Sequence, residues 1–154
     1  MSISTASARR TLFAVAALAP LALAAPLAGH AAAAPVDTAV YFTSPSGKWH
    51  CAIHPDGPEP FAGCRGPVPD HAPLVSGGGV DAIAPNGVKV VGGQPAAFVF
   101  YSDTSVDAPG APVLPYGQIV SAGAFSCAVD EVEGVTCGVR EHFFTVSDTA
   151  YKLG

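Results

Sequence analysis

The fold of this chain is decided by two similar seven-residue stretches, Gly47-Lys48-Trp49-His50-Cys51-Ala52-Ile53 and Gly123-Ala124-Phe125-Ser126-Cys127-Ala128-Val129. In each copy a glycine opens the stretch, an aromatic residue lies two positions before the cysteine, and alanine plus a β-branched residue follow. Side chains of a β-strand alternate between its two faces, so the aromatic, the cysteine and the β-branched residue share one face. We therefore expect two strands that turn this face inward.

Each copy is followed, after a loop of turn-forming residues, by a second cysteine: Cys64 after the first copy and Cys137 after the second. Four cysteines allow three pairings. The two similar local hairpins favour the sequential pairing, Cys51–Cys64 and Cys127–Cys137, in which each disulfide ties the two strands of one hairpin. Closing loops of this length stabilises a fold by about 3 kcal/mol per bridge.

The chain around these hairpins contains short β-type runs separated by proline- and glycine-rich turns, and no run has apolar residues at helical spacing. Asn86-Gly87 lies between two such runs and predicts a hairpin turn. We expect strands at 39–43, 48–53, 61–65, 80–84, 88–91, 96–101, 118–121, 124–129 and 135–140, the last extended by 143–146, with loops at 67–79 and 102–115.

The expected fold class is all-β: a small antiparallel sandwich or partly open barrel with two disulfide-tied hairpins, preceded by a helical signal peptide. The residues expected to face the interior are Val40, Phe42, Trp49, Ile53, Phe98, Phe100, Ile119, Phe125, Val129 and Val139.

Residues 1–33 have the composition of a secretory signal peptide. Arg9 and Arg10 form its positive start, an apolar run follows, and small residues precede the expected cleavage site near Ala33. Residues 34–154 then form a single exported β domain. The apolar run is interrupted by prolines and is shorter than the roughly 20 residues that a membrane-spanning helix needs, so no span is expected after cleavage.

The charge of the exported part is acidic. Loss of Arg9 and Arg10 with the leader leaves five basic against twelve acidic side chains, a net charge of −7. Such a surface disfavours nucleic acid and anionic membranes as partners. The even number of cysteines fits an oxidising compartment, so we expect the protein to be secreted or held in the cell envelope. We also expect it to be a monomer. The general secretory route and the twin-arginine route both remain open, because Arg9-Arg10 fits either.

Several short motifs together resemble a family of small exported proteins of actinobacterial type, described only as a domain of unknown function. The motifs are Phe42-Thr43-Ser44-Pro45-Ser46-Gly47, Leu114-Pro115-Tyr116-Gly117, the cysteine-containing Gly134-Val135-Thr136-Cys137, and the late residues His142, Phe144 and Tyr151. The chain departs from the family's pattern at Lys48, Glu141 and Phe143, and residues 66–110 carry no part of the resemblance. The resemblance implies an exported, disulfide-bonded domain without an established activity or cofactor.

No catalytic, cofactor-binding or metal-binding residue is assigned. His50 and His54 lie on one strand about 13 Å apart, too far for one small metal ion, and are expected to face solvent. The serines form no nucleophile elbow, and the cysteines are used in disulfides. The acidic cluster around Asp130 is expected to be a solvated turn.

Tyr116 and His142 are the candidate exposed binding residues, since Tyr116 lies in a loop between proline and glycine. The sequence favours a non-enzymatic extracellular or cell-envelope module that binds a protein, a peptide or a glycan. A secreted protease inhibitor that uses residues 102–115 as its reactive loop is one alternative, and an envelope hydrolase is another.

Overall fold

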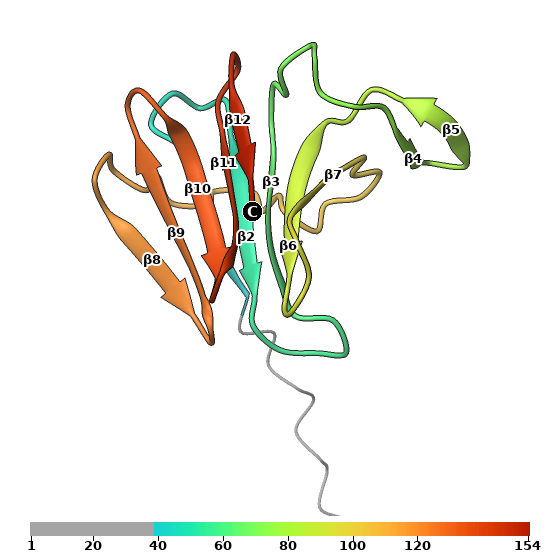
Figure 1. Ribbon diagram of the computed structural model, residues 1–154. Coiled ribbons are helices and arrows are strands. Elements are labelled where there is room, and N and C mark those ends of the chain that lie inside the picture. Colours follow the sequence, from blue (N-terminus) through green and yellow to red (C-terminus); the bar gives the residue numbers. More distant parts are fainter. Residues whose placement is uncertain (1–38) are drawn as a thin grey trace, which may run out of the picture. The chain divides into compact units, whose positions relative to one another are not determined.

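The computed structural model describes residues 39–154, and all the regular secondary structure there is β (Figure 1). The predicted signal peptide, residues 1–33 with cleavage near Ala33, lies outside this range and stays a prediction. Within 39–154 there is no helix, and hence none long and apolar enough to cross a membrane. The all-β fold class is confirmed.

Two antiparallel five-stranded sheets make up the fold. In spatial order, the N-terminal sheet contains β1 (Val40–Thr43), β2 (His50–His54), β3 (Phe61–Arg65), β6 (Gly87–Val91) and β7 (Ala97–Val99). The C-terminal sheet contains β8 (Ile119–Ala122), β9 (Phe125–Asp130), β10 (Gly134–Val139), β11 (His142–Val146) and β12 (Tyr151–Leu153). A separate hairpin, β4 (Val75–Gly77) with β5 (Val80–Ile83), is inserted between β3 and β6. Apart from this insertion, both sheets have the same meander topology.

Matching rows of residues cross the two sheets, with a disulfide inside each row. In the N-terminal sheet the cross-strand row is Phe42, Cys51, Cys64, Val88 and Phe98. In the C-terminal sheet it is Val120, Cys127, Cys137, Phe144 and Leu153. The predicted pairings Cys51–Cys64 and Cys127–Cys137 are both confirmed. The repeated stretch of sequence therefore corresponds to a repeated structural unit.

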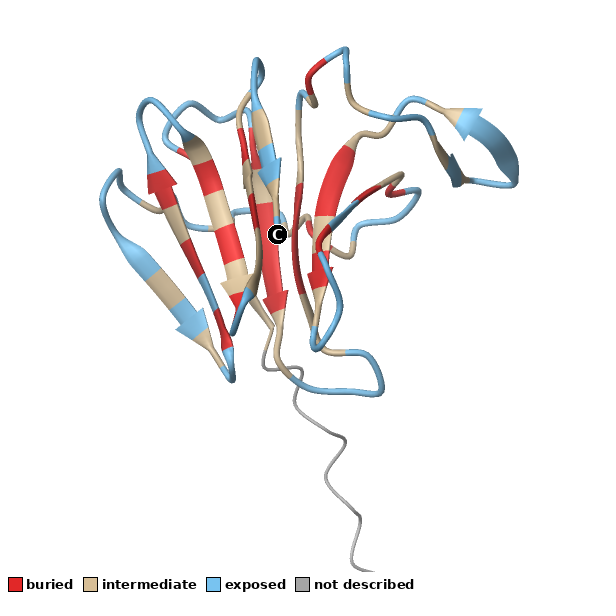
Figure 2. Cartoon of the chain, in the orientation of Figure 1, coloured by how far each residue is buried: buried red, intermediate tan, exposed pale blue. Residues whose placement is uncertain are grey.

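The two disulfides meet between the sheets. Sγ of Cys64 lies 4.0 Å from Sγ of Cys137, and this is a van der Waals contact because sulfurs in disulfides carry no hydrogen. The apolar core around them draws its buried side chains from both sheets, Trp49, Phe125 and Phe144 among them. Buried and less buried residues alternate along the whole of β9 and β10, as Figure 2 shows. The sheets thus form an antiparallel sandwich.

Most of the expected interior is confirmed, but Ile119 is wrong. Its side chain is 69% exposed, whereas its neighbour Val120 pairs with Cys127 and packs against the core. Two adjacent β-branched residues at the start of a strand are compatible with either phase of the alternation, and a shift by one residue exchanges the two faces. The expected residues that are buried are Phe42, Trp49, Ile53, Phe98, Phe125, Val129 and Val139, while Val40 and Phe100 are half-buried.

The hairpin predicted at Asn86-Gly87 is also wrong, because β5 pairs with β4 and β6 pairs with β3. The Asn86 side chain instead pairs with the backbone of Tyr101: Nδ2 donates to its carbonyl at 2.9 Å, and Oδ1 accepts from its N–H at 2.7 Å. Gly87 is required for close approach, since a Cβ there would lie 2.5 Å from the carbonyl oxygen of Cys64 and 2.6 Å from the Tyr101 ring.

Three further strand assignments differ from expectation. Residues 67–79, expected to be a loop, contain β4, and residues 96–101, expected to be a central strand, contain the edge strand β7. The C-terminal tail forms β12, and beyond it Gly154 exchanges two backbone hydrogen bonds with Phe143 of β11, at 2.8 and 3.1 Å. Such a pairing depends on a strand that is distant in space and leaves no local pattern.

Replacing Gly87 with alanine is expected to destabilise the fold by about 2 kcal/mol, because the added methyl overpacks the contact between β3, β6 and Tyr101. Gly92→Ala is the matched control: its nearest neighbour would be 4.0 Å away, so its free energy of unfolding is expected to change by less than about 0.5 kcal/mol. Urea unfolding measures both. Equal midpoints for the two variants would contradict this account of Gly87.

Candidate binding site

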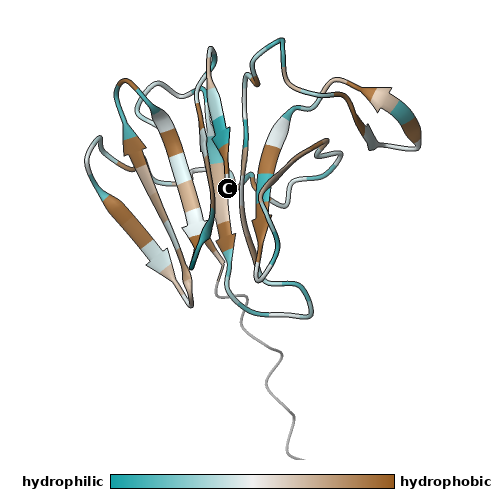
Figure 3. Ribbon diagram, viewed as in Figure 1, coloured by the Kyte–Doolittle hydropathy of each residue, from teal (hydrophilic) through white to brown (hydrophobic). Residues whose placement is uncertain are grey.

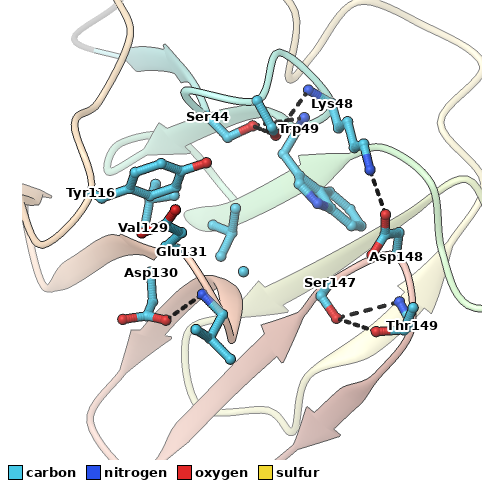
Figure 4. Close-up of a pocket in the computed structure, with 14 residues that line it drawn as sticks. Ser44, Lys48, Trp49, Tyr116, Val129, Asp130, Glu131, Ser147, Asp148 and Thr149 are labelled. Atoms are coloured by element: carbon cyan, nitrogen blue, oxygen red, sulfur yellow. Dashed lines mark hydrogen bonds and ion pairs between the residues drawn. The ribbon is translucent and has the colours of Figure 1, made fainter.

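A cavity of about 140 Å³, called here the turn-end cavity, lies where three turns and the Tyr116 loop meet (Figure 4). The turns are the β1–β2 turn (44–47), the β9–β10 turn (130–134) and the β11–β12 turn (147–150). Trp49, Val129 and Val135 also line the cavity. Residues that are far apart in the sequence, including those of the Ser-Pro-Ser-Gly and Leu-Pro-Tyr-Gly motifs, are therefore brought to one place.

The β1–β2 turn is held by its own backbone and by serine side chains. The N–H of Gly47 donates to the carbonyl of Ser44 at 2.9 Å, and Gly47 takes a positive φ of 70° that favours glycine. Ser44 is buried, and its Oγ accepts from the N–H of Trp49 at 3.1 Å and lies 2.9 Å from Oγ of Ser46. The serines of the motif thus fix the turn at the cavity.

The loop that carries Tyr116 is held from both sheets. The N–H of Leu114 donates to the carbonyl of Thr43 in β1, and the N–H of Gly117 donates to the carbonyl of Val129 in β9, at 2.9 and 2.8 Å. Gly117 has a φ of 75°, which a type II turn over Tyr116 and Gly117 requires. The backbone of Tyr116 is therefore fixed while 43% of the residue stays exposed, as predicted from its loop position.

Carboxylates and one ion pair surround the cavity. Oδ1 of Asp130 accepts from the N–H groups of Glu133 and Val132, at 2.9 and 2.7 Å, and these hydrogen bonds lower the pKa of Asp130. The acidic cluster is thus a solvent-exposed turn, as expected. Nζ of Lys48 lies 2.5 Å from Oδ2 of Asp148, and this pairing raises the pKa of Lys48 and lowers that of Asp148.

In Figure 4 the Tyr116 ring lies on the opposite side of the cavity from the Lys48–Asp148 pair. The lining between them carries hydroxyl groups and the carboxylate of Glu131. The arrangement therefore offers one aromatic face together with several hydrogen-bonding groups, a combination suited to a small polar ligand.

His142, the second candidate, lies elsewhere. It begins β11, and the β11–β12 turn at the cavity follows the opposite end of that strand. Its Nε2 lies 3.9 Å from Oε1 of Glu141, and only 20% of its side chain is exposed. A five-residue strand spans about 13 Å, so the structure does not bring His142 and Tyr116 together.

A second cluster, which the sequence did not reveal, lies on the outer face of the N-terminal sheet. Nδ1 of His50 is 2.8 Å from Oδ1 of Asp107, and Arg65 pairs with the other carboxylate oxygen of Asp107. His50 does point outward as expected, but its ring contacts the Asp107 carboxylate of the 102–111 segment. Asp107 is distant in sequence from both partners, so no local pattern indicated the cluster.

Comparisons of the chain with protein-family models, with curated proteins and with solved structures found no match. The interpretation of the turn-end cavity therefore rests on its geometry and chemistry alone.

The Asp130 carboxyl is expected to titrate below the ordinary pKa of an aspartate, because its ionised form accepts two backbone hydrogen bonds. Its stabilisation of the β9–β10 turn is then complete above the ordinary pKa and is lost as the pH falls through the lowered one. An NMR titration of the carboxyl carbon, followed together with the amides of Val132 and Glu133, measures this. A midpoint at or above the ordinary value would show that the turn is not held in this way.

Proposed function

We propose that this protein is an exported or cell-envelope binding module whose turn-end cavity recognises a glycan. The observation that carries the proposal is the Tyr116 side chain, exposed in a turn that hydrogen bonds fix to both sheets, at a cavity lined by hydroxyl and carboxylate groups. A sugar ring has an apolar C–H face for the aromatic ring and hydroxyl groups for the polar lining.

The size of the cavity supports a ligand that places a single sugar unit in it. Its volume of about 140 Å³ is well below the roughly 300–1,000 Å³ of pockets for drug-sized molecules. The fixed turns also reduce the conformational entropy that binding would cost, since the backbone of Tyr116 and the side chains of the serines at 44 and 46 are already held by hydrogen bonds. A rigid, shallow site of this kind suits one residue of a longer polymer.

Export is supported by the two disulfides and by the composition of the leader. Disulfides persist in oxidising compartments, and the sequence before residue 34 has the charge and apolar pattern of a signal peptide. The acidic surface of the exported part favours neutral or cationic partners over nucleic acid.

A protease inhibitor that uses residues 102–115 as its reactive loop fits the geometry less well. An inhibitory loop has to present its central residues to the protease, but Val106 is only 1% exposed and Asp107 is held by His50 and Arg65.

An envelope hydrolase would need a nucleophile beside a histidine and a carboxylate. The His50–Asp107 pair faces a cavity lined by Thr43 and Thr104 but by no serine or cysteine. Neither alternative has a supporting observation as direct as Tyr116.

Binding of the purified protein to an array of cell-wall and extracellular glycans tests the proposal. Tyr116→Ala is expected to weaken binding to the glycan identified by about tenfold, since one aromatic contact contributes about 1.4 kcal/mol. Val113→Ala is the matched control, because Val113 is similarly exposed in the same loop but does not line the cavity. Absence of glycan binding, or equal affinity of the two variants, would refute the proposal.

A further inference from the structure

The outer face of the N-terminal sheet is covered by a segment of the chain itself. Val106, in the 102–111 segment, is 1% exposed and belongs to a small apolar cluster with Ala52 of β2, which is fully buried. The cross-strand neighbours of Ala52 are Tyr41 and Gly63, and Tyr41 packs against the same cluster. A small residue in the sheet thus leaves room for an aliphatic side chain above it.

Polar contacts hold this segment in place on either side of Val106. His54 donates from Nε2 to the carbonyl of Ser105 at 2.6 Å, and the Asp107 carboxylate is paired with His50 and Arg65. The sheet therefore holds an aliphatic residue followed by an acidic one, with Ala52 below the first and the Arg65 guanidinium and the His50 ring beside the second.

The C-terminal sheet has the corresponding face, but it is open. Ala128 follows Cys127 as Ala52 follows Cys51, and its cross-strand neighbours are Ile119 and Thr136. A cavity of about 330 Å³ lies over this row and is lined only by residues of the sheet and its turns, from Ile119 to Phe143. Figures 2 and 3 show the edge strand β8 of this sheet as both largely exposed and partly apolar.

The charges at this face are complementary to an acidic ligand. Among residues 39–154, Lys48, Arg65 and Lys89 each pair with a carboxylate, whereas the ion pairs found there include none with Arg140 or Lys152. Arg140 lines the cavity, and Lys152 lies over the ring of Phe143, which lines it too, with Nζ 5.2 Å from the ring centroid. Within 39–154, Arg140 is the only charged residue that lines the cavity over Ala128, while Glu133 lines the adjoining hollow beside Lys152, so the acidic ligand is expected to pair with Arg140.

We propose that the outer face of the C-terminal sheet binds a turn-forming peptide segment of a partner protein, with an aliphatic side chain over Ala128 and an acidic side chain against Arg140, because residues 104–107 form such a turn on the N-terminal sheet. The binding mode repeats, between two proteins, the contact that residues 102–111 make with the N-terminal sheet. This surface is distinct from the turn-end cavity, so the proposal does not depend on glycan recognition.

Selection of a random decapeptide library on the immobilised protein tests this surface. The expected consensus is an aliphatic residue followed by Asp or Glu, and a selected peptide is expected to shift the NMR signals of Ala128, Thr136 and Arg140. Ala128→Arg should fill the space and weaken binding by about tenfold or more. Val80→Arg is the control, since Val80 is exposed on the separate β4–β5 hairpin.

Arg140→Glu provides a second test that leaves the packing of the sheet intact, because Arg140 is an exposed turn residue. Repeating the selection on this variant is expected to replace the acidic residue of the consensus with a basic one. A consensus without an acidic residue, an unchanged consensus for Arg140→Glu, or signal shifts confined to the turn-end cavity would overturn the proposal. So would sedimentation data showing a dimer that Ala128→Arg dissociates, because a second copy of the chain would then occupy this face.

Discussion

The contact between Sγ of Cys64 and Sγ of Cys137, 4.0 Å apart, joins the two halves of the structure. Each sulfur belongs to a disulfide that fixes the register of one hairpin, and each disulfide lies within a row of apolar side chains that crosses its sheet. Because equivalent cysteines touch, the two rows face each other and enclose Trp49 and Phe125. Two hairpins that would each be only marginally stable alone thus share one core.

The register of the strands in the core also determines which groups lie on the surface of the domain. The ends of the paired strands carry the turns that form the cavity beside Tyr116, so the geometry of that site follows from the alignment of the hairpins. The alternation that turns Cys51 and Cys127 inward turns Ala52 and Ala128 outward. One outer face is covered by Val106 and its neighbours, while the other is open, and the proposed peptide site rests on this difference between two similar sheets.

Local patterns were sufficient for the features that depend on neighbouring residues. The repeated stretch indicated both disulfides and the inward aromatic residues, and the Pro-Tyr-Gly loop indicated an exposed Tyr116. Features that depend on distant parts of the chain were missed. Asn86-Gly87 does not form a hairpin, because Asn86 bonds the backbone of Tyr101. Which residues of β8 face the core is set by the pairing of Val120 with Cys127. Asp107 contacts His50 only in the folded chain.

The most direct test of the central contact is a thermodynamic cycle on the two disulfides. Unfolding is measured for the wild-type protein, for variants with alanines at Cys51 and Cys64 or at Cys127 and Cys137, and for the fourfold variant, in a stabilising osmolyte. The two loops do not overlap in the sequence, so their chain-entropy contributions are additive, and any coupling reports the native contact. The account predicts that the fourfold loss is smaller than the sum of the two separate losses by about 1 kcal/mol. Additivity to within about 0.3 kcal/mol would contradict it.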